Sequence, residues 1–320
     1  MGKRKSAFSG LGRFVQSLQD PVKEREIIDL SNPQSGRNDD YPGQVDAGSN
    51  LSWVKKYDMT GLVPHYRNPE DVPDALRKYF FQRARFFSLY STPPGCLLDE
   101  EGWYSVTPEF IADQIAERCR CDTILDAFCG VGGNAIAFAK TCQRVIALDT
   151  SPTRLALARH NAQIYGVAQH IEFILSDYIT FAESYISRSS TSSKRKIDVV
   201  FLSPPWGGPS YISDSSPNDS DLLEESPEVH PTYPLSSIQP IHGANLFHLS
   251  RQITPNIAYY LPRNSDLNEI GALLEDPKQL VGDVQEFIEV EEEWMGDKLK
   301  ALTCYFGGLV GGQGDLFEQI

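Results

Sequence analysis

Strand-like and helix-like segments alternate through the middle of the chain, and this alternation restricts the fold more than any other feature. Apolar runs typical of buried strands lie at 123–130, 144–149, 171–177 and 197–205. Segments with helical apolar spacing lie between them, at 132–142, 151–166 and 178–188. Strands joined through helices run parallel, and right-handed crossovers cover both faces of their sheet. The pattern predicts a doubly wound α/β fold.

The second half of the domain extends this sheet and then changes its direction. A helix at 243–253, a strand at 256–264 and a helix at 266–276 continue the alternation. Residues 285–309 then read as two strands around Met295–Lys298, which predicts a hairpin. The expected sheet is therefore seven-stranded and mostly parallel, and it ends in an antiparallel hairpin.

The flanking segments set the expected domain boundaries. The predicted parts are a mostly flexible N-terminal tail at 1–70, a small helical subdomain at 71–118, the sheet domain at 119–310 and a C-terminal tail at 311–320. Inside the helical subdomain, helices are expected at 73–90 and 107–119, with a loop at 91–106. Thr107 would cap the second helix and Pro108 would occupy its first position. Inside the sheet domain, residues 212–242 form an acidic, proline- and serine-rich insertion without periodicity.

Charge and cysteine content exclude several classes of protein. The net charge of −14 and the pI near 4.9 argue against a long electrostatic footprint on nucleic acid, although a small end group could still be recognised. No apolar run approaches the ~20 residues of a membrane span. The six cysteines form no CxxC pair and have no histidine at zinc spacing, so reduced thiols and no metal site are expected.

Three acidic residues close successive predicted strands, at the edge where open α/β sheets bind ligands. Asp126 precedes the glycine turn, where Gly130 permits close backbone approach, and it would suit an ammonium group. Asp149 would accept hydrogen bonds from ribose hydroxyls, and Asp177 from an adenine amine. Because the phosphate-loop signature GxxxxGK[ST] is absent from the sequence, these acids predict a cationic adenosine ligand without phosphates, S-adenosylmethionine.

The same glycines leave two other interpretations open. Gly130, Gly132 and Ala135 satisfy G-x-G-x-x-A, which also occurs in NAD-dependent oxidoreductases, and a simple strand-to-helix turn needs similar glycines. Asp126 disfavours the dinucleotide, because its carboxylate would repel a pyrophosphate lying over the turn.

The fourth strand ends at Ser203-Pro204-Pro205-Trp206. Proline has no N–H and a fixed φ, so the pair stops the ladder and is expected to leave carbonyl groups free to accept hydrogen bonds from an amino group. The indole would stack on the ring that carries this amine. A cationic base such as 7-methylguanine would strengthen such stacking, and its acidified amine would need only a weak acceptor such as Ser203.

These motifs together resemble the RNA cap guanine-N2 methyltransferase family, over about residues 75–310. The resemblance is carried by "DAFCGVGGN", "ALARHNAQIYG", "DVVFLSPPWGGPSY" and "YYLPRN", with "KYFFQRARFFSLY" and "EGWYSVTPEFIA" upstream. It implies a Rossmann-like domain that moves two methyl groups from S-adenosylmethionine to the 7-methylguanosine cap of small nuclear and nucleolar RNAs. The products would be 2,2,7-trimethylguanosine and S-adenosylhomocysteine. A nuclear location, in the nucleolus or a nuclear body and also in the cytoplasm, is expected.

The resemblance also implies roles for individual residues. Trp206 would stack on the methylated guanine, while Ser203 and Pro204 place its N2 amine. The remaining assignments are Asn161 on the other edge of the base, Lys78, Arg263 and Asn264 on the cap triphosphate, and Phe87, Thr107, Cys129 and Gly130 at the cofactor.

Two questions remain open at this stage. A cap-binding module that has lost methyl transfer would share Trp206, although the acids predicted for the cofactor weigh against it. The acidic insertion at 212–242 is longer than the family pattern and would repel an RNA body, so it is expected to point away or to bind a basic ribonucleoprotein partner.

Overall fold

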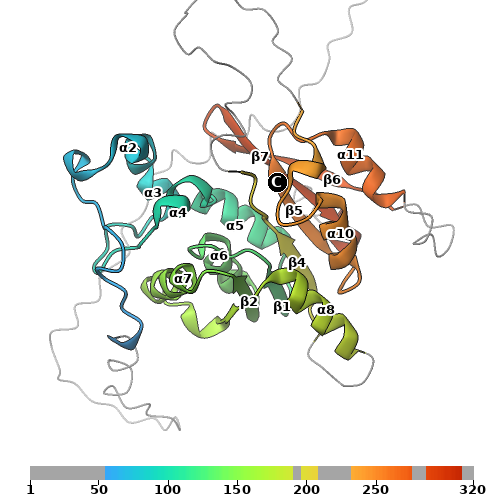
Figure 1. Cartoon of the computed structure of the whole chain (residues 1–320), viewed down its shortest axis with the longest axis horizontal. Helices are drawn as coiled ribbons and strands as arrows, with labels where there is room; N and C mark the ends of the chain where they lie inside the picture. The colour runs from blue at the N-terminus through green and yellow to red at the C-terminus, as the bar shows by residue number, and fades with distance from the viewer. Residues whose placement is uncertain (1–54, 190–195, 208–231, 276–285, 312–320) are drawn as a thin grey trace, which may run out of the picture. The chain divides into compact units, whose positions relative to one another are not determined.

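A seven-stranded sheet forms the centre of the computed structural model, which describes residues 55–189, 196–207, 232–275 and 286–311 (Figure 1). The strands are β1 (Thr123–Asp126), β2 (Arg144–Asp149), β3 (Ile171–Leu175), β4 (Val199–Leu202), β5 (Ile257–Pro262), β6 (Glu289–Met295) and β7 (Lys298–Phe306). Their order is β3-β2-β1-β4-β5-β7-β6. The first five are parallel, and β7 runs antiparallel to both β5 and β6. The predicted sheet and its terminal hairpin are therefore confirmed.

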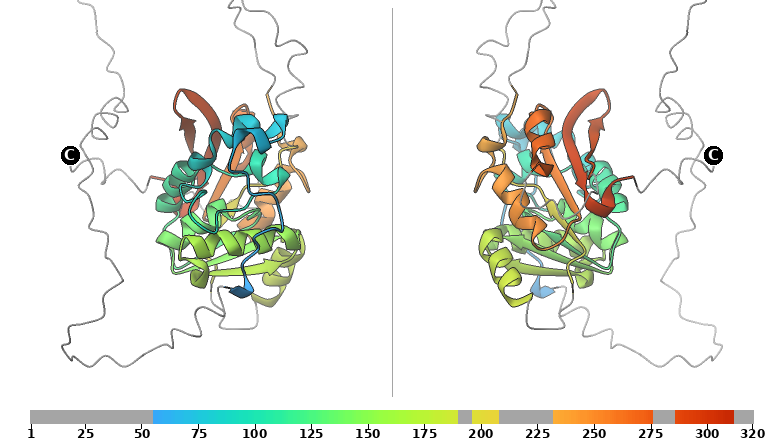
Figure 2. Two further views of the ribbon diagram at one scale, coloured as in Figure 1. Left: turned by 90° about the vertical axis from the view of Figure 1, so that its left-hand side faces the viewer. Right: turned by 90° about the vertical axis from the view of Figure 1, so that its right-hand side faces the viewer.

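Helices cover both faces of the sheet, as the alternating pattern predicts (Figures 1 and 2). One apolar core lies between the sheet and α5 (Glu109–Arg118), α6 (Gly133–Thr141) and α7 (Pro152–Ile164). A second core lies between the sheet and α8 (Tyr178–Ser189), α10 (Gly243–Arg251) and α11 (Leu267–Gly271). The strand order reverses between β1 and β4, and both of these strands are buried throughout. A ligand site is expected at this switch point.

The helical subdomain differs from its prediction in three places. The single helix expected at 73–90 is split into α2 (Asp74–Phe80) and α3 (Arg83–Phe86), because the side chains of Gln82 and Arg83 donate to the Lys78 and Phe80 carbonyls where α2 ends. The expected loop contains α4 (Glu100–Ser105), which Asp99 caps by accepting from the Gly102 N–H. Helix α5 begins at Glu109 without a side-chain cap, so the cap predicted at Thr107 is wrong.

The packed part of the chain begins before residue 71. Met59, Val63 and Tyr66 pack against the first apolar core. The Met59 backbone N–H donates to Nδ1 of the buried His160, at 3.1 Å. Three predicted parts lie wholly or partly outside the described residues: 1–54 of the N-terminal tail predicted at 1–70, 312–320 of the C-terminal tail predicted at 311–320, and 212–231 of the acidic insertion. Among the helices that are described, none has the length and apolarity needed to cross a bilayer.

Candidate active site

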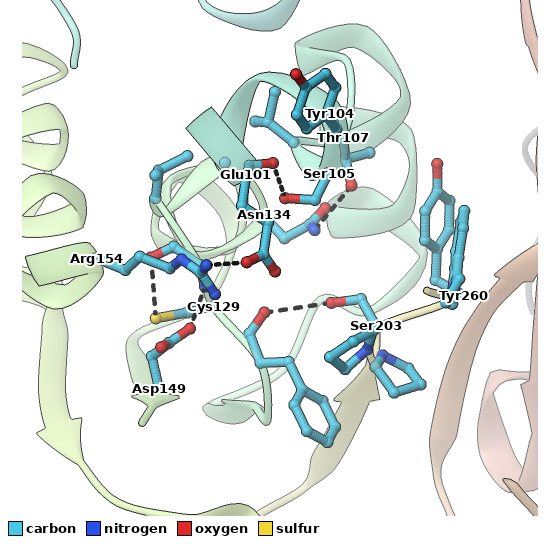
Figure 3. Close-up of a pocket in the computed structure, with 18 of the residues that line it drawn as sticks. Glu101, Tyr104, Ser105, Thr107, Cys129, Asn134, Asp149, Arg154, Ser203 and Tyr260 are labelled. Atoms are coloured by element: carbon cyan, nitrogen blue, oxygen red, sulfur yellow. Dashed lines mark hydrogen bonds and ion pairs between the residues drawn. The ribbon is translucent and has the colours of Figure 1, made fainter. Parts of the chain in front are cut away.

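A pocket of about 1150 Å³ lies beyond the carboxyl ends of the parallel strands, at the predicted position (Figure 3). The glycine turn after β1, the ends of β2 and β3, the Ser203–Gly207 segment and the β6–β7 hairpin all contribute to its wall. Helix α4 and the following residues of the helical subdomain close another side. The predicted residues that line it are Thr107, Cys129, Gly130, Asp149, Asp177, Ser203, Pro204, Trp206 and Arg263.

The turn between β1 and α6 holds its shape through two glycines and one carboxylate. Gly130 and Gly132 have φ angles of 52° and 93°, in the left-handed region that favours glycine. The carboxylate of Asp149 accepts hydrogen bonds from the Gly130 N–H, at 3.0 Å, and from the Ser151 N–H, at 2.7 Å. It therefore ties the turn to the start of α7 while still lining the pocket. A Cβ on Gly132 would meet Ala158 of α7 at 3.0 Å, so this turn packs closely on that helix.

Replacing Gly132 by alanine is expected to destabilise the protein by about 2–4 kcal/mol, from backbone strain plus overpacking against Ala158. Gly166→Ala is the matched control, because its φ is also positive, at 69°, but nothing lies within 4 Å of an added Cβ. This control should cost about 1–2 kcal/mol, from strain alone. The free energies of unfolding in urea measure both effects. Equal losses in the two variants would contradict the close packing.

Asp126 lies beneath the turn as a buried carboxylate. It is fully buried, and neither oxygen accepts a hydrogen bond from any of the described residues. Burial raises its pKa to about 7, the nearby charge of Asp149 adds to the shift, and the Phe128 backbone N–H, outside hydrogen-bonding geometry, offsets part of it. It lies next to the pocket-lining Ala127 and Phe128 but does not itself line the pocket, so its contact with an ammonium group stays a prediction.

The structure also describes the surroundings of three other residues predicted to bind the cofactor, Asp177, Thr107 and Cys129. One oxygen of Asp177 accepts from the Thr180 N–H and hydroxyl at the start of α8, which leaves its second oxygen for a ligand. The Thr107 hydroxyl accepts from the Asn134 side-chain amide at 3.0 Å and so joins the helical subdomain to α6. Burial raises the pKa of the Cys129 thiol, which is therefore neutral.

The Ser203–Trp206 segment presents its side chains to the pocket. Trp206 is half-buried and packs beside the Tyr260 ring, with centroids 5.2 Å apart and planes tilted by 31°. The Ser203 hydroxyl donates to the Phe128 carbonyl at 3.4 Å, so its lone pairs remain available to accept from an amine (Figure 3).

The expectation that the carbonyls here stay free is only partly right. The Pro205 carbonyl accepts from the Gln239 N–H, and the Trp206 carbonyl accepts from the Tyr233 hydroxyl. The carbonyl of Pro204 accepts no hydrogen bond from any residue that the structure describes.

Two assignments made by resemblance are corrected. Asn161 is fully buried, and its amide donates to the Leu97 and Val131 carbonyls while its oxygen accepts from the Leu97 N–H. It therefore joins α7 to the helical subdomain and has no surface for a base. Phe87 is 2% exposed and packs near the Tyr165 ring, so it is a core residue and does not close the pocket. Asn264 and Lys78 also lie outside the pocket wall, so their contact with the triphosphate stays a prediction.

Basic side chains gather at the hairpin end of the pocket. We call Lys78, Arg85, Arg263, Lys298 and Lys300 the cation group. Burial lowers the pKa of Lys300, and the charges of the other four lower it further, so each of these four lies within electrostatic range of Lys300. Within the described part of the chain, no member forms an ion pair with an acidic residue. Cations that have no acidic partner among the described residues favour an anion at this end of the pocket.

Several pocket residues were missed by the sequence analysis. Arg154 of α7 pairs with Asp99, at 3.0 Å, and with Glu101. All three line the pocket, so this network joins α4 to α7 at its edge (Figure 3). The signal for α4 was present in the sequence, because Asp99 followed by Glu100 and Glu101 is typical of a helix start.

Comparisons with known proteins identify the family of the chain. The family model for RNA cap guanine-N2 methyltransferases matches residues 121–309. The trimethylguanosine synthase of Schizosaccharomyces pombe is 34% identical over 241 residues, which cover 73% of this chain and 87% of that protein. The trimethylguanosine synthase of Saccharomyces cerevisiae is 35% identical over 200 residues, which cover 61% of this chain and 57% of that protein. A solved methyltransferase from Geobacter sulfurreducens has a TM-score of 0.38 at 14% identity, over 80% of this chain and 96% of that chain. The chain belongs to the RNA cap guanine-N2 methyltransferase family.

Proposed function

We propose that this chain methylates the exocyclic N2 amine of a 7-methylguanosine RNA cap, twice in succession, to give 2,2,7-trimethylguanosine. The observation that carries the proposal is the placement of Trp206 and Ser203 in the same pocket as the glycine turn and Asp149. A base-stacking indole, an acceptor for an amine and a nucleoside-binding turn are the three parts that such a reaction needs. The family membership supports the same chemistry.

The residues present suit S-adenosylmethionine as the methyl donor. Asp126 is a buried carboxylate that has no hydrogen-bond partner in the described part of the chain, and an ammonium group nearby would compensate its charge. Gly130 has open space where a side chain would stand, so a ligand can approach its backbone. Asp149 and the second oxygen of Asp177 would accept from the ribose hydroxyls and the adenine amine. When bound, this cofactor supplies an electrophilic methyl group on a sulfonium.

The protein's own contribution is to position the amine. Trp206 would fix the plane of the cationic guanine, and an electron-rich indole favours that charge. The Ser203 hydroxyl and the Pro204 carbonyl would accept hydrogen bonds from the two N–H groups of the amine. These bonds would point the nitrogen lone pair at the methyl carbon. The nitrogen–carbon bond forms as the carbon–sulfur bond breaks, and the nitrogen then releases one proton.

The cation group would bind the cap triphosphate. Arg263, Lys298 and Lys300 line the same pocket as Trp206, and Lys78 and Arg85 lie within electrostatic range of Lys300. A guanine stacked on Trp206 would send its phosphates toward this end. Because the rest of the protein is acidic, we propose that recognition is concentrated on the cap and that the acceptors are small nuclear and nucleolar RNAs in the nucleus.

Incubation with S-adenosylmethionine and a 7-methylated cap dinucleotide tests the function. Mass spectrometry should detect products with one and then two added methyl groups, and the unmethylated guanosine dinucleotide should react far more slowly because it lacks the ring charge. Equal rates on both dinucleotides would overturn the selectivity for a cation. Binding of the cap without any transfer would favour a cap-binding module instead.

A further inference from the structure

A pair of tyrosines continues the pocket wall from the cation group onto the helical subdomain. Lys78 lies with its Nζ 5.0 Å from the centre of the Tyr79 ring, and Tyr79 meets Tyr104 edge-on, with ring centroids 5.0 Å apart and planes at 80°. Both tyrosines line the pocket, and Figure 3 shows Tyr104 at its edge above Ser105 and Thr107. The neighbouring side chains of Lys78, Tyr79 and Tyr104 therefore connect the cation group to the edge of the pocket.

Tyr104 keeps a ring face clear of its neighbour Tyr79. The ammonium of Lys78 covers one face of Tyr79. In an edge-to-face pair, one ring presents its edge and the other a face, so Tyr104 keeps at least one face clear of Tyr79 whichever arrangement holds. Its side chain is only half-buried. The ring is therefore a surface on which a flat group can stack.

The charges around Tyr104 select the kind of group. Glu100 lies one turn before Tyr104 on α4, and Glu101 lies on the same helix. Burial raises the pKa of the Tyr104 phenol, and the charge of Glu100 raises it further. These carboxylates would repel a phosphate at the ring itself. A neutral aromatic group beside the phosphates suits the site better, and every nucleobase has a π-face for such stacking.

We infer that Tyr104 stacks on the base of the nucleotide that follows the cap triphosphate, so that the enzyme binds the cap together with the first residue of the RNA. The inference rests on the proposed function, because it takes the triphosphate to lie on the cation group. Stacking on a π-face makes this subsite tolerant of base identity. The substrate would then be a capped dinucleotide or RNA in preference to a free 7-methylguanosine nucleotide.

The ratio of two affinities tests this subsite. Wild-type protein should bind a 7-methylguanosine cap dinucleotide at least about fivefold more tightly than 7-methylguanosine triphosphate, which is the lower end of what one base–aromatic stack provides. Tyr104→Ala should bring the ratio close to one, and Tyr104→Phe, which keeps the ring, should retain it. Isothermal titration in the presence of S-adenosylhomocysteine gives both dissociation constants.

Phe110→Ala is the matched control, because Phe110 is an exposed aromatic of α5 that does not line the pocket. Its ratio should equal that of the wild type. A wild-type ratio of one, or a Tyr104→Ala ratio equal to the wild type, overturns the inference; the second result would arise if the ring stacked on the methylguanine itself. Methyl transfer to 7-methylguanosine triphosphate by the wild type keeps the proposed function intact in either case, whereas no transfer to any cap compound would defeat that function first.

Discussion

Replacing Trp206 by alanine is expected to weaken binding of a 7-methylguanosine cap analogue by about 100-fold and to leave S-adenosylhomocysteine binding unchanged. Stacking of a base on an aromatic side chain provides about 1–3 kcal/mol, and a cation held over a desolvated indole adds to it. A loss near 3 kcal/mol corresponds to about 100-fold in affinity. Fluorescence titration of the cap analogue and calorimetry of S-adenosylhomocysteine measure the two affinities separately.

A second tryptophan provides the control for this result. Trp294 lies on the edge strand β6, is 47% exposed and does not line the pocket, so Trp294→Ala should bind the cap like the wild type. The unmethylated cap analogue adds a further check, because it should lose less affinity than the methylated one when Trp206 is removed. Unchanged cap affinity in Trp206→Ala would show that the indole only packs on Tyr260.

The long segments with periodic apolar spacing made the fold predictable. The short segments whose ends depend on side-chain hydrogen bonds to the backbone could not be predicted. The strands and helices from β1 to β5 each bury a face whose spacing is visible in the sequence, and Ser151 caps α7 by accepting from the Arg154 N–H. The break after α2 depends on the Gln82 and Arg83 side chains, which bond to carbonyls within the same turn. Such local competition with the helix leaves no mark in the apolar spacing.

Strand-end chemistry located the pocket, but burial decided which residues face it. Asp149, Asp177, Ser203 and Trp206 follow directly from the rule that parallel strands end at one edge, and all four line the pocket. Asn161 lies on α7, and only the folded structure shows that its amide donates to the Leu97 and Val131 carbonyls. The hairpin lysines line the pocket although the sequence analysis did not predict them. Nothing local in the sequence indicates that Lys300 of β7 comes within electrostatic range of Lys298 and of Lys78 on α2.

Replacing Asp126 by asparagine is expected to stabilise the protein without ligand at neutral pH. The folded state raises the pKa of Asp126 from 3.8 to about 7, so between these values the folded protein holds a proton that the unfolded chain has lost. Stability therefore falls as pH rises from about 4 to 7, by on the order of 4 kcal/mol. Asparagine has no charge to bury, so the variant should lose this pH dependence. Urea unfolding at pH 5 and pH 7.5 gives the comparison.

The same variant should weaken binding of S-adenosylhomocysteine, because the carboxylate that destabilises the free protein is the predicted partner of the ligand's ammonium. Wild-type affinity should rise by up to about tenfold per pH unit below pH 7 and level off above it, since an ammonium selects the ionised form of Asp126. Asp126→Asn should bind more weakly, and its affinity should not change with pH in this way.

Glu293→Gln is the matched control. Burial raises the pKa of Glu293 to about 7 as well, but its carboxylate accepts from the Thr303 hydroxyl on β7 and does not line the pocket. That variant should also flatten the pH dependence of stability, yet bind the ligand like the wild type. If Asp126→Asn has a higher free energy of unfolding but binds S-adenosylhomocysteine like the wild type, Asp126 supports the glycine turn and does not contact the cofactor.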